Sequence, residues 1–155
     1  YKRHVGSKTL KNDCLARFSI PYESGTLEAV SYDAADHEIG RYKLQSAGGA
    51  TSRTLDAEEP AAQTGHLCYV RLRYTDENGI TKPLMRGNIQ VQVRGGTLVG
   101  LGSACPFNKH SYLDSETDTY YGEALAIVRM GDGDAMTIAA SDGEYSAELT
   151  VSAQV

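Results

Sequence analysis

The chain has 155 residues, enough for one domain of ordinary size or for one domain and part of another. Its 15 lysines and arginines against 20 aspartates and glutamates give a formal net charge of −5. This mild acidity argues against a nucleic-acid partner, and no apolar run approaches the roughly 20 residues of a membrane span. A hydrophobic content of 41% is too high for a disordered chain of this charge. The composition therefore indicates a globular protein, and many glycines and tyrosines favour strands and turns.

The three cysteines and the first residue limit the kinds of site and the origin that the chain can have. Cys14, Cys68 and Cys105 form no CxxC pair, which excludes a zinc ribbon and a thioredoxin-type motif. We expect three unpaired thiols, with Cys68 acting as a small core residue. The sequence starts at Tyr1 and not at a methionine, and it shows no charged region followed by an apolar stretch, as a signal peptide would. We therefore expect a chain that is processed or cut from something larger.

The N-terminal part shows strand patterns without enough length for a complete domain. Alternation of Ala16, Phe18 and Ile20 predicts a strand that ends at Pro21, and residues 26–32 predict another. We expect about three or four strands before the small, glycine-rich segment 45–52, which is typical of a linker. Residues 1–46 are therefore interpreted as the C-terminal part of a preceding β-sandwich domain.

Alternation with a period of two is clearest after the linker. The predicted inward-facing sets are Cys68, Val70, Leu72 and Tyr74; Ile89, Val91 and Val93; Met136, Ile138 and Ala140; and Tyr145, Ala147, Leu149 and Val151. Residues 124–128 are almost continuously apolar, which predicts a central strand covered on both sides. The glycine-rich stretch 95–102 is interpreted as a tight loop between strands. Short strands separated by turn signals predict an all-β fold: an immunoglobulin-like β-sandwich over residues 47–155, preceded by part of a second β-sandwich.

Six segments in order resemble the C-terminal region of bacterial β-galactosidases of glycoside hydrolase family 2. The sequence FSIPYESGTLEAVSYD at 18–33 is similar to that family's FxVPYxPGxLxAVAYD stretch. The others are LQSAG at 44–48, LDAE at 55–58, CYV and TDENG within 68–79, GGTLVGLGSA at 95–104 and YGEALAIVR at 121–129. Two loop positions depart from the family pattern: Ser24 replaces a proline, and Ser103-Ala104 replace an Asn-Gly pair.

The resemblance implies an accessory region of a larger enzyme. The family hydrolyses β-galactosides and related glycosides with retention, which needs two carboxyl groups about 5–5.5 Å apart. In the family these are glutamates on a TIM barrel, and a barrel takes about 250 residues, more than this chain has. The resemblance thus implies no catalytic residue and no cofactor here. The implied partners are the missing catalytic barrel, other domains of the same chain and a second copy in a homo-oligomer, in an extracytoplasmic (periplasmic or secreted) location.

From the residues alone, the best candidate ligand or interdomain surface surrounds the long polar stretch 106–118. Its members are Phe107, His110, Tyr112, Tyr120 and Tyr121. Sugar sites use aromatic faces with a few convergent polar groups, so a glycan is one candidate ligand. Packing of these rings on the sandwich or on the missing catalytic domain is the alternative, and the absence of tryptophan favours packing.

Asp132 and Asp134 are the weak candidates for a metal site. They could contribute oxygen ligands to Ca²⁺, but the spacing of a calcium-binding loop is not met, so a polar hairpin tip is favoured. Two functions from other classes remain beside the structural role. One is a carbohydrate-binding module, and the other is a bacterial Ig-like adhesion domain, which predicts tandem copies that this chain does not show.

Overall fold

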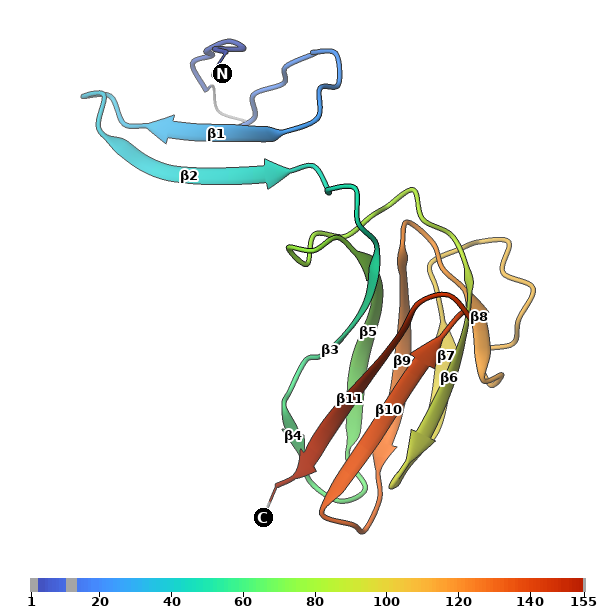
Figure 1. Cartoon of the computed structure of the whole chain (residues 1–155). Helices are drawn as coiled ribbons and strands as arrows, with labels where there is room; N and C mark the ends of the chain where they lie inside the picture. Colours follow the sequence, from blue (N-terminus) through green and yellow to red (C-terminus); the bar gives the residue numbers. More distant parts are fainter. Residues whose placement is uncertain (1–2, 11–13, 155) are drawn as a thin grey trace. The chain divides into compact units, whose positions relative to one another are not determined.

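The computed structural model describes residues 3–10 and 14–154, and these residues form strands, turns and loops but no helix (Figure 1). They accordingly contain no helix that could span a membrane. The chain divides into two compact units, Tyr1–Ser46 and Ala47–Val155. Cys14, Cys68 and Cys105 are all free thiols, as predicted.

The described part of the first unit contains one β-hairpin. Strands β1 (Thr26–Tyr32) and β2 (Glu38–Gln45) pair in antiparallel fashion. The strand expected around residues 16–20 does not form, so the prediction of three or four strands is wrong for these residues. Alternation makes a strand only when a partner accepts its hydrogen bonds, and no described segment pairs with this one.

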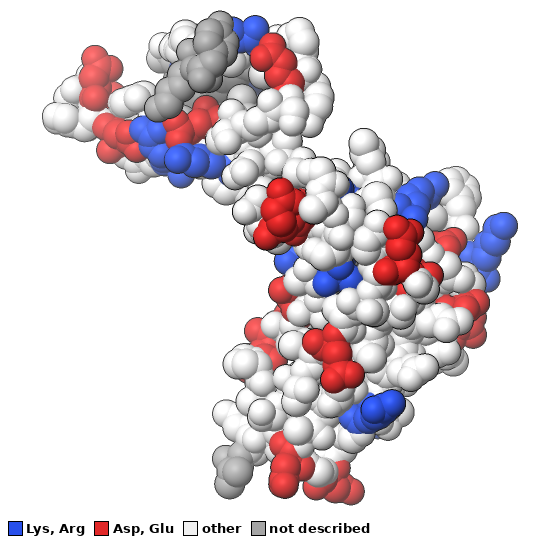
Figure 2. Space-filling model, viewed as in Figure 1, with Lys and Arg blue, Asp and Glu red and all other residues white. Residues whose placement is uncertain are grey.

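The hairpin has one apolar face and one charged face. Leu27 lies opposite Leu44 on the apolar face, where they are 48% and 56% exposed. On the charged face, the Arg41 guanidinium binds the carboxylates of Glu28 at 2.5 Å and Glu38 at 2.6 Å. Figure 2 shows acidic and basic side chains side by side on the hairpin. None of the described residues of this unit is buried, and a lone two-stranded hairpin is only marginally stable.

The second unit is a sandwich of two sheets, and in each sheet the neighbouring strands are mostly not consecutive in the sequence. The first sheet has the order β3 (Ser52–Ala57), β5 (Leu67–Thr75), β9 (Glu123–Met130) and β7 (Gly96–Gly102). The second has the order β4 (Ala61–Ala62), β11 (Ser146–Ala153), β10 (Ala135–Ser141), β6 (Asn88–Arg94) and β8 (Glu116–Asp118). Neighbouring strands are antiparallel except β4 and β11, which are parallel. The predicted all-β, immunoglobulin-like sandwich is confirmed.

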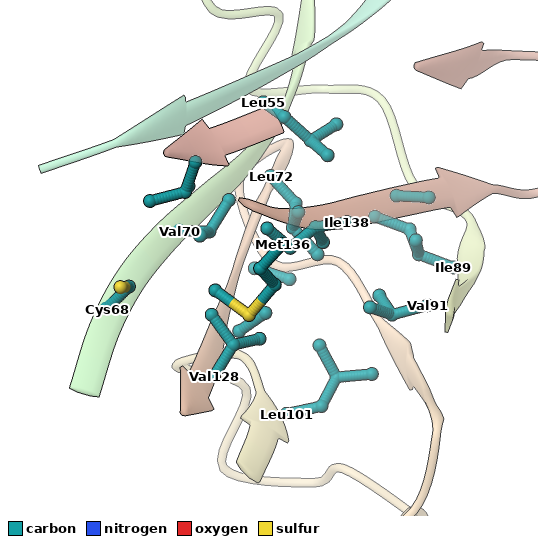
Figure 3. Close-up of a cluster of buried hydrophobic side chains, with 14 of the residues drawn as sticks. Leu55, Cys68, Val70, Leu72, Ile89, Val91, Leu101, Val128, Met136 and Ile138 are labelled. Carbon is teal, nitrogen blue, oxygen red and sulfur yellow. The ribbon is translucent and has the colours of Figure 1, made fainter. Parts of the chain in front are cut away.

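The core lies between the two sheets, where the predicted alternation places it. On β5, Cys68, Val70 and Leu72 point inward and are at most 6% exposed. They face Met136 and Ile138 of β10, which are fully buried, and Figure 3 shows side chains from both sheets meeting in this layer. The sandwich is therefore held by one continuous apolar cluster, whose burial drives folding.

Strand β9 differs from its prediction on one face. It is an inner strand of its sheet, and Ala124, Ala126 and Val128 are buried as expected. The intervening Leu125 is 40% exposed and Ile127 is partly exposed, so the described residues cover only one side of the strand. The continuous apolar run therefore leaves a hydrophobic outer surface.

The glycine-rich stretch 95–102 also differs, because most of it forms the edge strand β7 rather than a loop. Gly95 makes the turn from β6 into β7 at a φ of +72°. A Cβ there would lie 2.4 Å from the carbonyl oxygen of Ala135, so both the backbone conformation and the close approach require glycine.

A buried polar cluster joins the two sheets at one end of the sandwich. Arg53 of β3 donates from Nη2 to the Asp142 carboxylate at 2.6 Å, and its guanidinium lies 4.0 Å from the centre of the Tyr74 ring. The Tyr74 hydroxyl donates to the same carboxylate. Burial by itself would raise the pKa of Asp142, but the Tyr74 hydroxyl and the N–H groups of Tyr145 and Glu144 together hold it below its ordinary value. The Arg53 side chain is fully buried, and this carboxylate compensates its positive charge there.

The segment that follows Ser46 is fixed to the sandwich by two charged side chains. Asp76 accepts hydrogen bonds from the N–H groups of Gly48 at 2.7 Å and Ile80 at 2.9 Å. The Lys82 ammonium donates to the carbonyl oxygens of Gly49 at 2.9 Å and Ala50 at 2.8 Å. The predicted linker is thus a bound strap over at least residues 48–50.

This strap should loosen in acid. The Gly48 N–H, followed by other backbone donors, holds the pKa of Asp76 below its ordinary value despite burial. The stabilisation is therefore complete above the unfolded pKa of about 4 and is lost as the pH falls through the folded value. We expect the melting temperature to fall between pH 5 and pH 2 by less in Asp76→Asn than in the wild type. Asp132→Asn, in an exposed turn, should leave that fall unchanged, and equal behaviour of both variants would refute the role of Asp76.

Candidate functional site

An open groove of about 710 Å³ lies on the outer face of the four-stranded sheet. Leu125 and Ile127 of β9 and the glycines Gly100 and Gly102 of β7 line it. The ring of Tyr112 rests directly on the backbone at Gly102, where a Cβ would lie 2.4 Å from the ring. Glycine on the edge strand therefore makes room for an aromatic side of the groove.

Charged side chains from three strands surround the apolar part of the groove. Asp56 is paired with Arg73 at 2.7 Å, and the Glu123 carboxylate accepts a hydrogen bond from Thr81 at 3.3 Å. Arg71 also lines the groove, and its guanidinium has no hydrogen bond or ion pair with the described residues. The groove thus combines an apolar floor with one unpaired cation.

The structure brings together only part of the predicted candidate surface. Tyr112 and Tyr120 line the groove, and Tyr121 packs edge-on against Tyr120 with ring centres 4.6 Å apart. Phe107 is 85% exposed, and His110 lies 3.4 Å from the Glu116 carboxylate; neither lines the groove. Whether these residues bind a ligand or another domain stays a prediction.

Tyr120 is held in its neutral form. The adjacent Tyr121 phenol, followed by burial, raises the pKa of Tyr120 above its ordinary value. A tyrosine phenol already keeps its proton at neutral pH, so this direction of shift leaves Tyr120 a hydrogen-bond donor as well as an acceptor.

The weak metal candidates lie elsewhere. Asp132 and Asp134 occupy the exposed turn between β9 and β10. Across residues 3–10 and 14–154, no group of three or more His, Cys, Asp and Glu side chains could hold a metal ion.

Sequence reasoning missed the floor of the groove. Leu125, Ile127 and Arg71 are outward positions on two neighbouring strands, and Arg71 pairs directly with Leu125 in the register. The available signal is the apolar run 124–128, which by itself predicts burial on both faces. The register of β5 against β9, which assembles these positions into one surface, is a non-local property.

Comparison with known proteins places this sandwich in a family. The family described as glycoside hydrolase family 2 C-terminal domain 5 matches residues 52–150. No curated protein matches the chain.

Solved structures extend the similarity beyond the sandwich. A glycosyl hydrolase family 2 member from Bacteroides cellulosilyticus is 28% identical, with a TM-score of 0.78, over 86% of this chain and 19% of its own. A β-glycosidase from Bacteroides vulgatus and a β-glucuronidase of the family share the fold, with 19% and 15% identity and TM-scores of 0.75 and 0.70. They are covered over 18% and 15% of their lengths, so the chain spans less than a fifth of each of these three enzymes.

The sandwich topology, the matched residues and the similarity to solved enzymes agree. The chain belongs to glycoside hydrolase family 2, and residues 52–150 form its C-terminal domain 5.

Proposed function

We propose that this chain is a non-catalytic accessory region of a β-galactosidase-like, retaining glycoside hydrolase, and that it supports the catalytic part of the same enzyme. The observation that carries the proposal is the extent of the match. A family model for a C-terminal domain covers residues 52–150, while most of this chain aligns with only 19% of a related enzyme. Such a region accompanies a catalytic domain that lies outside it.

The charged groups of the groove agree with a structural role. Retaining hydrolysis needs two carboxyl groups on either side of the scissile bond, one as nucleophile and one as acid and base. In the groove, Asp56 is held by Arg73 and Glu123 accepts a hydrogen bond from Thr81. These carboxylates are engaged with their own sandwich, which supports the absence of chemistry here.

The identity of the parent's substrate rests on the six sequence segments that resemble β-galactosidases. Enzymes with the same fold in this region include a β-glycosidase and a β-glucuronidase, so the shared fold leaves the sugar open, and only the segments support the proposal of a β-galactoside. An extracytoplasmic location and a homo-oligomeric state are part of the same proposal.

The hairpin supports a domain assignment within this proposal. Its apolar face carries Leu27, Tyr42 and Leu44, and these side chains are 48–69% exposed. Residues 1–46 are proposed as the end of a preceding β-sandwich, whose other strands would cover that face.

The test compares the purified chain with the full-length enzyme on chromogenic β-galactoside and β-glucuronide substrates. We expect no hydrolysis by the chain above a mock purification, and hydrolysis of the galactoside by the full-length enzyme. Activity of the chain that disappears in Glu123→Gln or Asp56→Asn would refute the non-catalytic role. Preference of the full-length enzyme for the glucuronide would refute the β-galactosidase assignment alone.

A further inference from the structure

We propose that the outer face of the four-stranded sheet is a docking surface, covered in the intact enzyme by an apolar protein surface from the rest of the same polypeptide. This outer sheet face consists of Leu67, Tyr69 and Arg71 of β5 and Leu125 and Ile127 of β9. The inference rests on the proposed function, because it needs a longer enzyme, and it names the surface through which the accessory region acts.

The apolar side chains of the outer sheet face, Leu67, Tyr69, Leu125 and Ile127, form a strip across β5 and β9, and Arg71 lies beside it. β5 and β9 are the two inner strands of the sheet, and Tyr69 lies directly opposite Ile127. Leu67, Tyr69 and Leu125 are 43%, 39% and 40% exposed, although each is large and hydrophobic. Side chains of this kind, gathered on adjacent inner strands rather than scattered, mark an interaction surface.

The opposite side of the sandwich provides an internal comparison. The outward positions on the inner strands of the five-stranded sheet are mostly polar: Gln90 and Gln92 on β6, Thr137 and Ala139 on β10, and Glu148 and Thr150 on β11. Acidic and basic side chains are intermingled on the face of the sandwich that Figure 2 shows. An antiparallel sheet with one solvated face has this polar outer pattern. The outward positions of β5 and β9 depart from it, because four large apolar side chains lie together there, between the charged Arg71, Arg73, Glu123 and Arg129.

The sequence of β9 fits burial on both sides. Ala124, Leu125, Ala126, Ile127 and Val128 form an unbroken apolar run. Such runs are typical of strands covered on both faces, whereas strands with one wet face alternate. The core covers Ala124, Ala126 and Val128. Leu125 and Ile127 face outward, and in the isolated chain no protein layer from the described residues of the sandwich covers them, although the run is suited to burial on both faces.

Two observations favour protein as the occupant. Three of the four apolar side chains, Leu67, Leu125 and Ile127, are aliphatic and only Tyr69 is aromatic, whereas a sugar ring packs best on aromatic planes. Related enzymes are more than five times as long as the part matched here, since this chain covers 19% and 18% of them, so a large protein surface is available. Arg71 lies unpaired beside this strip, and charge complementarity calls for a carboxylate on the covering surface.

The test uses matched pairs of substitutions on the two outer faces of the sandwich. The docking pair is Leu125→Asp with Ile127→Asp on β9, and the control pair is Thr137→Asp with Ala139→Asp on β10. Both pairs add two charges at alternate outward positions of an inner strand. In the isolated chain the two pairs should change the melting temperature equally. In the full-length enzyme the docking pair should lower it by at least about 3 °C more than the control pair.

Three results would overturn the proposal. Equal effects of the two pairs in the full-length enzyme would mean that the outer sheet face is solvated. Saturable NMR shifts at Leu125 and Ile127 of the isolated chain with lactose or longer oligosaccharides would make a glycan the occupant. A dimer of the isolated chain in sedimentation, dissociated by the docking pair alone, would make a second copy the occupant. An immunoblot of the native protein at only 16.7 kDa would instead remove the proposed function itself.

Discussion

Replacing Asp142 by alanine is expected to lower the free energy of unfolding of the sandwich by about 3–5 kcal/mol. The substitution leaves the Arg53 guanidinium fully buried without its carboxylate and removes the acceptor of the Tyr74 hydroxyl. A buried charge without a partner is far more costly than the loss of a surface ion pair. Urea unfolding followed by tyrosine fluorescence and circular dichroism measures the change.

The same turn offers a control, and the pair offers a rescue. Glu144→Ala removes a carboxylate two residues away that is exposed, and it should change stability by less than about 0.5 kcal/mol. Arg53→Met combined with Asp142→Ala removes both charges and should recover much of the loss, since apolar replacements of buried pairs are often tolerated. If Asp142→Ala does not fold, the double variant still decides. Equal stability of Asp142→Ala and Glu144→Ala would show that the cluster does not hold the sheets.

Replacing Ile138 by alanine is expected to cost about 2–5 kcal/mol. Ile138 lies in the middle of β10, is fully buried and belongs to the cluster between the sheets. Truncation removes transfer free energy and leaves a cavity, because strands paired on both sides cannot collapse into the space.

Leu84 provides the matched truncation for this experiment. It is 92% exposed, so Leu84→Ala removes a similar volume with an expected cost below about 0.5 kcal/mol. Ile138→Val should fall between the two, at about 0.5–1.5 kcal/mol. Denaturant midpoints at constant m-value measure all three, and a cost for Ile138→Ala no larger than that for Leu84→Ala would contradict the packing of the core.

Much of the sandwich could be predicted from its sequence because its signals are local. On β5, β6 and β10, apolar residues alternate with polar ones, and the turn Asp142-Gly143 joins β10 to β11 as the sequence indicates. The φ of +92° at Gly143 is one that glycine adopts freely. The sequence therefore predicts strands and turns correctly where neighbours in the sequence determine the backbone conformation of a residue.

The predictions are wrong where the formation of a strand depends on pairing with a segment that is distant in the sequence. Residues 16–20 alternate like a strand but pair with no described segment, while β4 is a strand of two residues only because β11 lies beside it. The candidate site shows the same limit. Tyr112 and Tyr120 were found from composition, but Arg71 and Leu125 meet only through the register of β5 and β9. No window of local sequence contains that register.

The place of β11 sets the time at which the sandwich can form during synthesis. Of the sandwich strands, β11 is the last to be translated, yet it lies between β4, one of the first sandwich strands, and β10. Since translation proceeds at about 5–20 residues per second, the earlier strands are without this neighbour for several seconds. A premature stop codon before Val151, which is fully buried, would leave the core open along β10. Nearly the whole sandwich must therefore be translated before its core closes and resists proteolysis.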